Sequence, residues 1–308
     1  MRKSFVILLV AALAALAAGC GSDDTDDVGA EDTTAATETD TVSTATAQDT
    51  CAPESLNLVE PGQLTIGTDN PAFPPWFEGG TPEGSSWEIN DPATGEGFES
   101  AVAYAVAEEL GFTEDEVEWT VVPFNQSFRP GPKDFDFDIN QISYTERRAQ
   151  NITFSDSYYD VNQAVVALNS SPIANASSLA ELQDAKLGAP VGTTSYDYIV
   201  ENVQPSQDPS VYDTLNDGVS ALAAGQIDGL VVDLPTAFFI TAVQVEDGKI
   251  VGQFPSVGEQ EYFAMAFELD NPLVECVNEA LAALKEDGTL DAIQQEWLSD
   301  KASAPVLE

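Results

Sequence analysis

The sequence contains no histidine and only 10 lysine and arginine residues, against 53 aspartate and glutamate residues. Without histidine the chain cannot build the usual zinc sites, a Ser-His-Asp triad or the most common general base. Its 3 cysteines are too few for a cysteine-rich metal site. These absences exclude most metalloenzymes and hydrolases, and we expect neither catalytic residues, nor a metal, nor a cofactor.

Basic residues are so scarce that the formal net charge is −43. Such a surface repels phosphate backbones, so nucleic acid is not an expected partner. The acidity is better explained by solubility or by a surface adapted to high salt, and it selects no ligand. Apolar residues make up 43% of the chain, which is too many for a disordered protein and enough for one large domain or two lobes.

The N-terminus predicts export. Arg2 and Lys3 precede an apolar run over residues 5–18, which is shorter than the roughly 20 residues that span a bilayer. The small residues 17–19 then precede Cys20, as at a bacterial lipoprotein cleavage site. We expect an acylated Cys20 that anchors the protein to the outer face of the cell membrane. An ordinary secretory signal with a chance cysteine is the alternative.

A polar, acidic segment follows the signal over residues 21–50. It has too few apolar side chains to offset its ordering entropy, so we expect a flexible linker. Cys51 and Cys276 are the cysteines left for the folded part. Outside the cell they favour a disulfide between the start of the folded part and its last helices. A buried free thiol at Cys276, which lies on the apolar face of a predicted helix, stays open.

The remaining sequence alternates strand-like and helix-like segments. Apolar residues recur every four positions from Phe98 to Leu110, which predicts a helix that ends at Gly111. Residues 117–121 and 135–140 alternate apolar and polar side chains, as half-buried strands do. Strands that alternate with helices predict an α/β fold. The folded part, of about 250 residues, could form one domain or two, because composition places no boundary.

Six motifs in order resemble extracytoplasmic solute-binding proteins of the polar amino-acid type, which are the receptors of ABC importers. The most specific stretch is ISYTERR at 142–148 followed by FSDSYY at 154–159. The others are LTIGTD at 64–69 followed by FPPW at 73–76, GFE at 97–99, GTT at 192–194, QIDGLVVD at 226–233 and KEDGTL at 285–290. The loop between Phe77 and Gly97 is longer than this family usually has.

The resemblance implies a two-lobed periplasmic-binding-protein fold of type II, with two hinge crossover strands and a ligand cleft between the lobes. Lobe 1 would comprise residues 51–163 and 261–308, and lobe 2 residues 164–260. Cys51 and Cys276 would then lie in the same lobe, which also favours the disulfide.

A free amino acid is a zwitterion, so its receptor needs a fixed cation and a fixed anion. Arg148 is the expected cation, because its planar fork can hold a carboxylate at two points. Asp233, which ends an apolar run, is the expected partner of the α-ammonium. A surface arginine and a helix-capping aspartate are the alternatives for these two residues.

The resemblance also assigns further ligand contacts, most of them from uncharged residues. Ser143 and Thr194 would bind the ligand carboxylate, and Gly192 would leave room for the chain at a helix start. Phe73 and Phe124 would stack on the aliphatic part of the ligand. Asp69 would contact the ligand side chain, and an acid there suits a cationic or an amide group better than an acidic one.

The function implied is delivery of a polar amino acid to an ABC permease by hinge closure, carried out by a monomer. A dehydratase-type enzyme on the same scaffold is the first alternative. It would need Glu99 or Asp69 as an acid or base with a pKa raised by burial. A ligand-sensing subunit of a membrane receptor is the second alternative.

Overall fold

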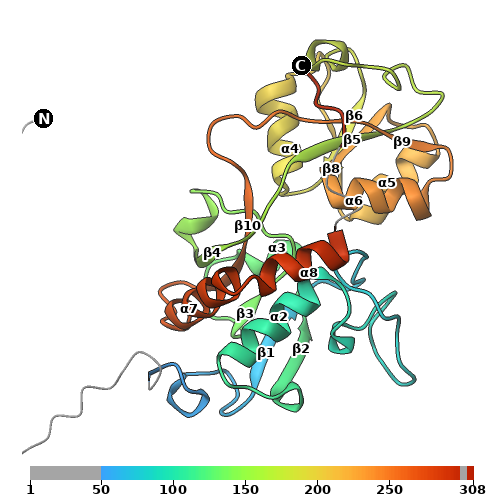
Figure 1. The fold of residues 1–308 in the computed structure, drawn as a ribbon. Helices are drawn as coiled ribbons and strands as arrows, with labels where there is room; N and C mark the ends of the chain where they lie inside the picture. The colour runs from blue at the N-terminus through green and yellow to red at the C-terminus, as the bar shows by residue number, and fades with distance from the viewer. Residues whose placement is uncertain (1–49, 299–303) are drawn as a thin grey trace, which may run out of the picture. The chain divides into compact units, whose positions relative to one another are not determined.

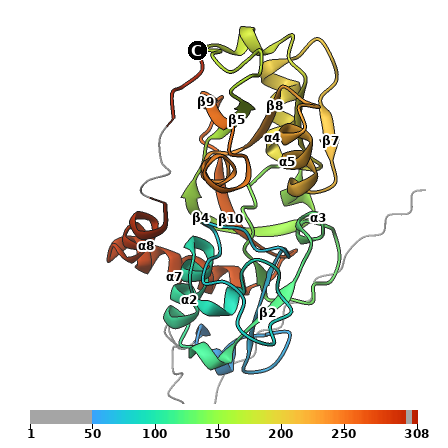
Figure 2. The same ribbon diagram turned by 90° about the vertical axis from the view of Figure 1, so that its right-hand side faces the viewer.

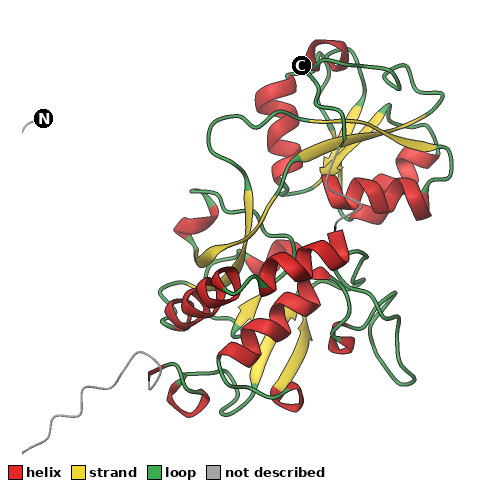
Figure 3. Ribbon diagram, in the orientation of Figure 1, coloured by secondary structure: helices red, strands yellow, loops and turns green. Residues whose placement is uncertain are grey.

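The computed structural model describes residues 50–298 and 304–308. It contains two β-sheets, each packed against helices (Figures 1 and 3). The strand order of the first sheet is β2-β1-β3-β10-β4. Its strands are β1 (Leu64–Thr68), β2 (Val117–Val121), β3 (Phe137–Asp138), β4 (Ile152–Asp160) and β10 (Tyr262–Glu268). The helices of this lobe are α2 (Phe98–Glu109), α3 (Phe124–Ser127), α7 (Leu273–Glu286) and α8 (Thr289–Leu298). Short 3-10 helices are η1 (Pro53–Ser55), η2 (Pro92–Thr94), η3 (Glu114–Glu116) and η4 (Arg148–Gln150).

The second sheet, with strand order β7-β6-β8-β5-β9, defines the second lobe. Its strands are β5 (Gln163–Leu168), β6 (Leu187–Pro190), β7 (Ser210–Tyr212), β8 (Gly229–Asp233) and β9 (Gly248–Gln253). Its helices are α4 (Thr194–Tyr198), α5 (Leu215–Ala223) and α6 (Leu234–Phe239), with η5 (Leu179–Leu182) and the π-helical turns η6 (Ile199–Val203) and η7 (Ile240–Gln244). The chain passes between the sheets from β4 to β5 and from β9 to β10.

Helix α2 shows how local sequence determines an element. Phe98, Val102 and Val106 are fully buried on one face, as the four-residue spacing predicts. The helix is capped by Gly97, whose φ is 99°, and a Cβ there would lie 2.5 Å from the Cα of Phe77. Only glycine fits this close approach. The helix ends where the sequence predicts, just before Gly111, whose φ is 89°. By contrast, the strand predicted over residues 135–140 is shorter, since β3 spans only 137–138.

The C-terminal residues correct one expected boundary. Residues 304–308 were expected in lobe 1, but they lie against β9 of the second lobe (Figure 2). The backbone N–H of Leu307 donates to the carbonyl of Gln253 at 2.9 Å. The Leu307 side chain is only 1% exposed and packs into the second lobe's core. Burial of this one apolar side chain, together with the strand-like bonds, places the segment there. The other lobe bounds stay a prediction.

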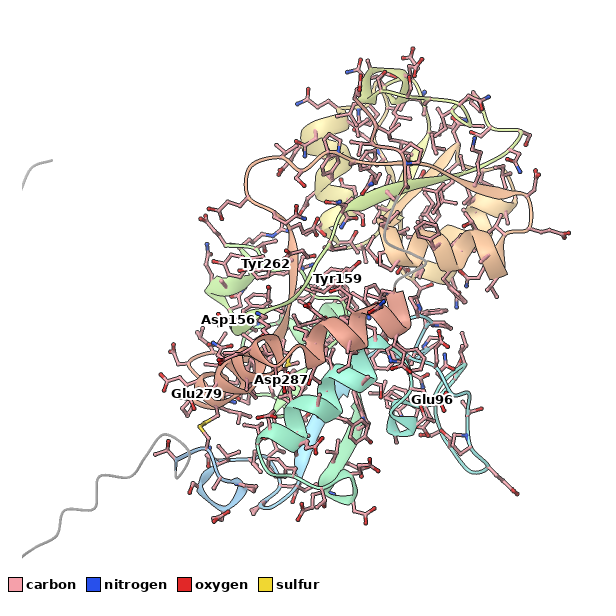
Figure 4. All side chains as sticks on the ribbon, viewed as in Figure 1. Glu96, Asp156, Tyr159, Tyr262, Glu279 and Asp287 are labelled. Atoms are coloured by element: carbon pink, nitrogen blue, oxygen red, sulfur yellow. A yellow bond between two sulfur atoms is a disulfide. The ribbon has the colours of Figure 1, made fainter. Side chains whose placement is uncertain are left out.

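The expected disulfide is confirmed. Cys51 and Cys276 are bonded, with their Cα atoms 5.5 Å apart and a sequence separation of 225. Figure 4 shows the yellow bond near Glu279 of α7. Cys276 is 8% exposed within the first lobe's core. The cross-link therefore ties the entry of the folded chain to α7.

Among the described residues, no helix is both long enough and apolar enough to cross a membrane. The signal, Cys20 and residues 21–49 of the linker lie outside the described residues, so those expectations stay predictions.

Candidate functional site

A cavity of about 410 Å³ is lined by residues of both lobes. In the first lobe β1, β2 and β3 are parallel, and in the second lobe β6 is parallel to β7 and to β8. The segments after these strands line the cavity. They contribute Asp69, Phe124 and Asn140 from the first lobe, and Thr194, Asp213 and Asp233 from the second. Ligands of open α/β sheets bind outside the carboxyl ends of parallel strands, so the topology favours a binding site here.

Arg148 is buried at the cavity wall, with 4% of its surface exposed. Its Nη1 donates to the carbonyl of Ser143 at 2.6 Å, and its Nη2 donates across the lobes to the carbonyl of Gly192 at 2.8 Å. Its guanidinium lies 4.4 Å from the ring centroid of Phe128 and 5.5 Å from that of Phe124. Nε is buried without a partner. Burial lowers the pKa of Arg148 to about 10, and the group stays charged at neutral pH. The alternative that Arg148 is an exposed surface arginine is therefore wrong.

Asp233 ends β8 and lines the cavity from the opposite lobe. Its carboxylate accepts from the backbone N–H of Thr236 at 2.9 Å and so caps α6. Burial raises its pKa to about 6. Asp233 is therefore a helix cap, as the alternative held. This does not exclude a role in the cavity, because the same residue caps α6 and lines the cavity.

Ser143 and Thr194 meet across the lobes, with their hydroxyl oxygens 3.3 Å apart, and both line the cavity. Two partners were missed from the sequence. The hydroxyl of Ser143 donates to Glu261 at 2.6 Å, and the amide of Gln163 donates to the same carboxylate at 3.1 Å. Glu261 and Gln163 lie at the crossovers between the lobes, where no sequence motif singles them out.

Gly192 differs from expectation. It does not line the cavity, and the nearest atom to a Cβ at this position would be 3.8 Å away, on Phe128. Space for the chain is therefore not the reason for glycine. Glycine suits this position because its φ of 75° is a left-handed conformation that glycine adopts without strain. This turn directs the Gly192 carbonyl at Arg148.

Phe73, Phe124 and Asp69 all line the cavity as expected. The ring of Phe73 lies 6.4 Å from that of Phe239 in the second lobe, centroid to centroid. Asp69 accepts from the backbone N–H of Asn70 at 2.8 Å, and burial raises its pKa.

Thr68 and Asn140 also line the cavity beside Asp69, and the sequence analysis missed them. Thr68 is 0% exposed and Asn140 is 5% exposed. The Thr68 hydroxyl and the Asn140 amide nitrogen have no hydrogen-bond partner. Unpaired buried polar atoms are costly, so a bound polar group would relieve both. A polar residue at the end of a buried strand is the signal that could have found them.

Residues 64–300 match the family model of bacterial extracellular solute-binding proteins, family 3. The chain belongs to this family. It is 27% identical to the L-cystine-binding protein TcyJ of Escherichia coli K12 over 249 residues, covering 79% of this chain and 85% of TcyJ. A solved ancestral arginine-binding protein bound to glutamine is 27% identical, with a TM-score of 0.61, and the match covers 77% of this chain and 97% of that one. A Streptococcus pneumoniae ABC transporter substrate-binding protein with bound histidine is 25% identical, with a TM-score of 0.61, covering 79% and 95%.

These similarities confirm the expected family and two-lobed fold of this solute-binding protein. Its lobes also contact each other beside the cavity. The indole N–H of Trp76 donates to the Thr236 hydroxyl at 3.1 Å, in a buried position. Arg147 pairs with Asp197 at 2.9 Å on the surface. With the bond from Arg148 to Gly192, these contacts join the lobes around the site.

Glu99 bears on the enzyme alternative. Its side chain is fully buried, and it accepts hydrogen bonds from the Tyr158 hydroxyl and from the side chain and backbone N–H of Gln141, the last at 2.7 Å. Burial raises its pKa to about 7. That value suits a general acid, but Glu99 does not line the cavity; Gln141 lies at the wall instead. The carboxyl therefore supports the wall and does not face a bound molecule.

Glu99 should make this solute-binding protein less stable as pH rises. Its folded pKa of about 7 exceeds the ordinary 4.5, so between these pH values the folded state binds more protons than the unfolded state. Stability should fall across that window by on the order of 2–3 kcal/mol from this group. Urea unfolding from pH 5 to 8 should show a flatter pH dependence in Glu99→Gln. Glu118→Gln, at an exposed glutamate of β2, should keep the wild-type slope, and an equal slope in Glu99→Gln would contradict the assignment.

Proposed function

We propose that this protein binds a free polar amino acid outside the cell and delivers it to an ABC permease. The observation that carries the proposal is the pair of oppositely charged groups on opposite lobes of one cavity, the buried Arg148 and the partly buried Asp233. A zwitterion brings both missing partners at once. Its carboxylate would pair with Arg148 and its ammonium with Asp233, while Thr194 would add a hydroxyl contact to the carboxylate and Ser143 would add one if its O–H turned from Glu261 to the ligand.

The unpaired Nε of Arg148 supports this pose. Nη1 and Nη2 each make one bond to a backbone carbonyl, while Nε has no partner. A guanidinium has five N–H donors in a planar fork, so the Nε–H remains as a donor for a ligand carboxylate. The rings of Phe73 and Phe124 would cover the aliphatic part of the ligand.

The side-chain end of the ligand would lie near Asp69, Thr68 and Asn140. Asp69 is an acceptor when ionised, and the Thr68 hydroxyl can also accept. A ligand group that donates hydrogen bonds, either a cation or an amide, therefore fits Asp69 better than a carboxylate, and an amide oxygen would also accept from the unpaired Asn140 nitrogen. The relatives compared above are named for binding cystine, arginine or glutamine, and histidine.

Hinge closure would couple binding to transport. The ligand would touch both lobes, and the bonds from Trp76 to Thr236 and from Arg148 to Gly192 would form only when the lobes meet. The permease would recognise that closed form of a monomer. The dehydratase alternative is not favoured, because the relatives compared above are named for binding amino acids, and Glu99, one of the two carboxyls it could use, does not line the cavity.

A thermal-shift screen tests the function. The mature domain, unfolded and refolded to remove bound ligand, would be screened against the common amino acids in low and high salt. Stabilisation by a small, chemically related set is expected, and those ligands should carry a cationic or amide side chain. No shift by any of them, in a protein that circular dichroism shows to be folded, would reject amino-acid binding.

Binding should strengthen between pH 5 and 7. The pKa of Asp233 is about 6 without ligand, and an ammonium beside it stabilises the ionised form. The ligand thus binds the ionised protein, whose fraction rises about tenfold from pH 5 to 7, so Kd should fall by about the same factor. Titration calorimetry at each pH measures this. Asp233→Asn should bind more weakly and lose the trend, whereas a pH-independent Kd in the wild type would contradict the pairing.

We also propose that Cys20 carries the lipid anchor and that residues 21–50 hold the binding domain away from the membrane. Cells expressing the full chain would be fed a labelled fatty acid, and label is expected on the wild type and not on Cys20→Ser. An unlabelled wild type that is still exported would favour an ordinary secretory signal.

A further inference from the structure

Residues 78–97 form an irregular segment between Phe77, which lines the cavity, and α2. The segment contains one short 3-10 helix, η2, and no strand. None of its residues lines the cavity. Three of its polar contacts nevertheless reach residues 69–73, which form one side of the cavity.

Asn90 makes the first connection. It is 5% exposed, although the residues on either side of it lie closer to the surface. Its side-chain amide donates to the carbonyl of Ala72 at 3.0 Å, and its side-chain oxygen accepts from the backbone N–H of Gly80 at 3.0 Å. One buried side chain, in the second half of the segment, therefore joins the cavity wall to the start of the segment.

Asn70 makes the second connection, from the cavity side. Its side-chain oxygen accepts from the backbone N–H of Glu88 at 2.8 Å, and its amide donates to the Ser86 carbonyl at 3.4 Å. The backbone N–H of the same residue donates to the Asp69 carboxylate at 2.8 Å. The segment thus restrains the residue that orients Asp69.

We propose that residues 78–97 brace the cavity wall and that Asn90 is a positioning residue for ligand binding. The wall segment 69–73 lies beyond the end of β1 and has no strand partner. Its backbone makes a turn bond, from the Phe77 N–H to the Phe73 carbonyl at 3.0 Å, and side-chain contacts add to it, among them the buried bond from Asn90 to Ala72. Without it, Asp69 and Phe73 would sample more orientations, and the ligand would have to order them on binding. The role in binding rests on the proposed function, while the bracing itself does not.

Amide hydrogen exchange tests the brace without a ligand. In Asn90→Ala, peptides covering residues 69–77 should exchange at least about tenfold faster than in the wild type. Thr94→Val is the matched control, because its hydroxyl bonds to Glu78 and Asp91 within the segment, at 2.9 Å each, and not to residues 69–73. Its exchange over 69–77 should equal that of the wild type. Unchanged exchange in Asn90→Ala, or equal acceleration in Thr94→Val, would overturn the proposal.

A binding measurement completes the test, with L-arginine and L-glutamine as probes. Kd for the tighter probe should rise about tenfold in Asn90→Ala and less than twofold in Thr94→Val. A rise below twofold in Asn90→Ala would overturn its positioning role. If the wild type binds neither probe nor any other amino acid, the proposed function fails, and the exchange data still decide the brace. Asn90→Asp, measured at pH 8, replaces Asn90→Ala if that variant is unfolded, because it keeps the acceptor for Gly80 and removes the amide donor to Ala72.

Discussion

Replacing Arg148 with alanine should raise the Kd for the amino acid at least about thirtyfold, equivalent to about 2 kcal/mol. The guanidinium is the buried cation of the cavity, and its removal would leave the ligand carboxylate in a low-dielectric site with only neutral partners. Titration calorimetry on refolded, ligand-free protein measures the effect. Arg148→Lys should recover only part of the affinity, because an ammonium cannot reproduce the planar fork.

The neighbouring arginine provides the matched control. Arg147→Ala removes the same charge from the same turn, but the Arg147 side chain is 67% exposed and contacts Asp197 on the surface. A general electrostatic effect in so acidic a chain would weaken binding equally in both variants. A specific role for Arg148 predicts less than about a threefold change in Arg147→Ala, since exposed ion pairs contribute about 0–1 kcal/mol. Equal losses in the two variants, or an unchanged Kd in Arg148→Ala, would contradict the assignment.

Residues that end buried strands could be identified from the sequence. Asp233 follows an apolar run, whereas Asp69 was assigned by the resemblance, and the structure places both at the cavity, because the carboxyl ends of parallel strands in each sheet face the same space. The helix over Phe98–Glu109 was equally predictable, since its apolar spacing and the glycines beside it are local features. Local patterns therefore predicted this helix and the strand end at Asp233, while the resemblance supplied most of the other candidate site residues.

Contacts between distant parts of the chain could not be predicted in this way. Trp76 donates a hydrogen bond to Thr236, 160 positions away in sequence. Asn90, which lies in a loop with no periodic pattern, donates one to the carbonyl of Ala72. The C-terminal segment is a similar case, because the burial of Leu307, backbone bonds to Gln253 and a bond from the Gln253 side chain to the Ala304 carbonyl place it beside β9. Such contacts depend on three-dimensional packing, to which neither hydropathy nor spacing gives a signal. The motifs of the resemblance located the wall residues but gave no information on what supports them.

Removing the disulfide should cost about 3–5 kcal/mol of stability. The bond closes a loop of 225 residues, which spans nearly the whole folded part of the chain, and long loops lose the most unfolded-state entropy when cross-linked. Cys276 is also packed in the first lobe's core, so the double variant Cys51→Ser/Cys276→Ser carries a small additional cost from a buried hydroxyl. Urea unfolding under oxidising conditions should show a clearly lower midpoint for this variant.

Reduction separates the cross-link from the substitution. A reductant such as dithiothreitol should lower the midpoint of the wild type nearly to that of the double variant, and it should leave the double variant unchanged. The disulfide joins the start of the folded chain to α7 within the first lobe, and neither cysteine lines the cavity. Ligand affinity, measured where both forms are folded, should therefore stay within about twofold, because the cross-link acts on the unfolded chain and not on the site. A wild-type midpoint that does not respond to reduction would mean that the bond contributes no stability.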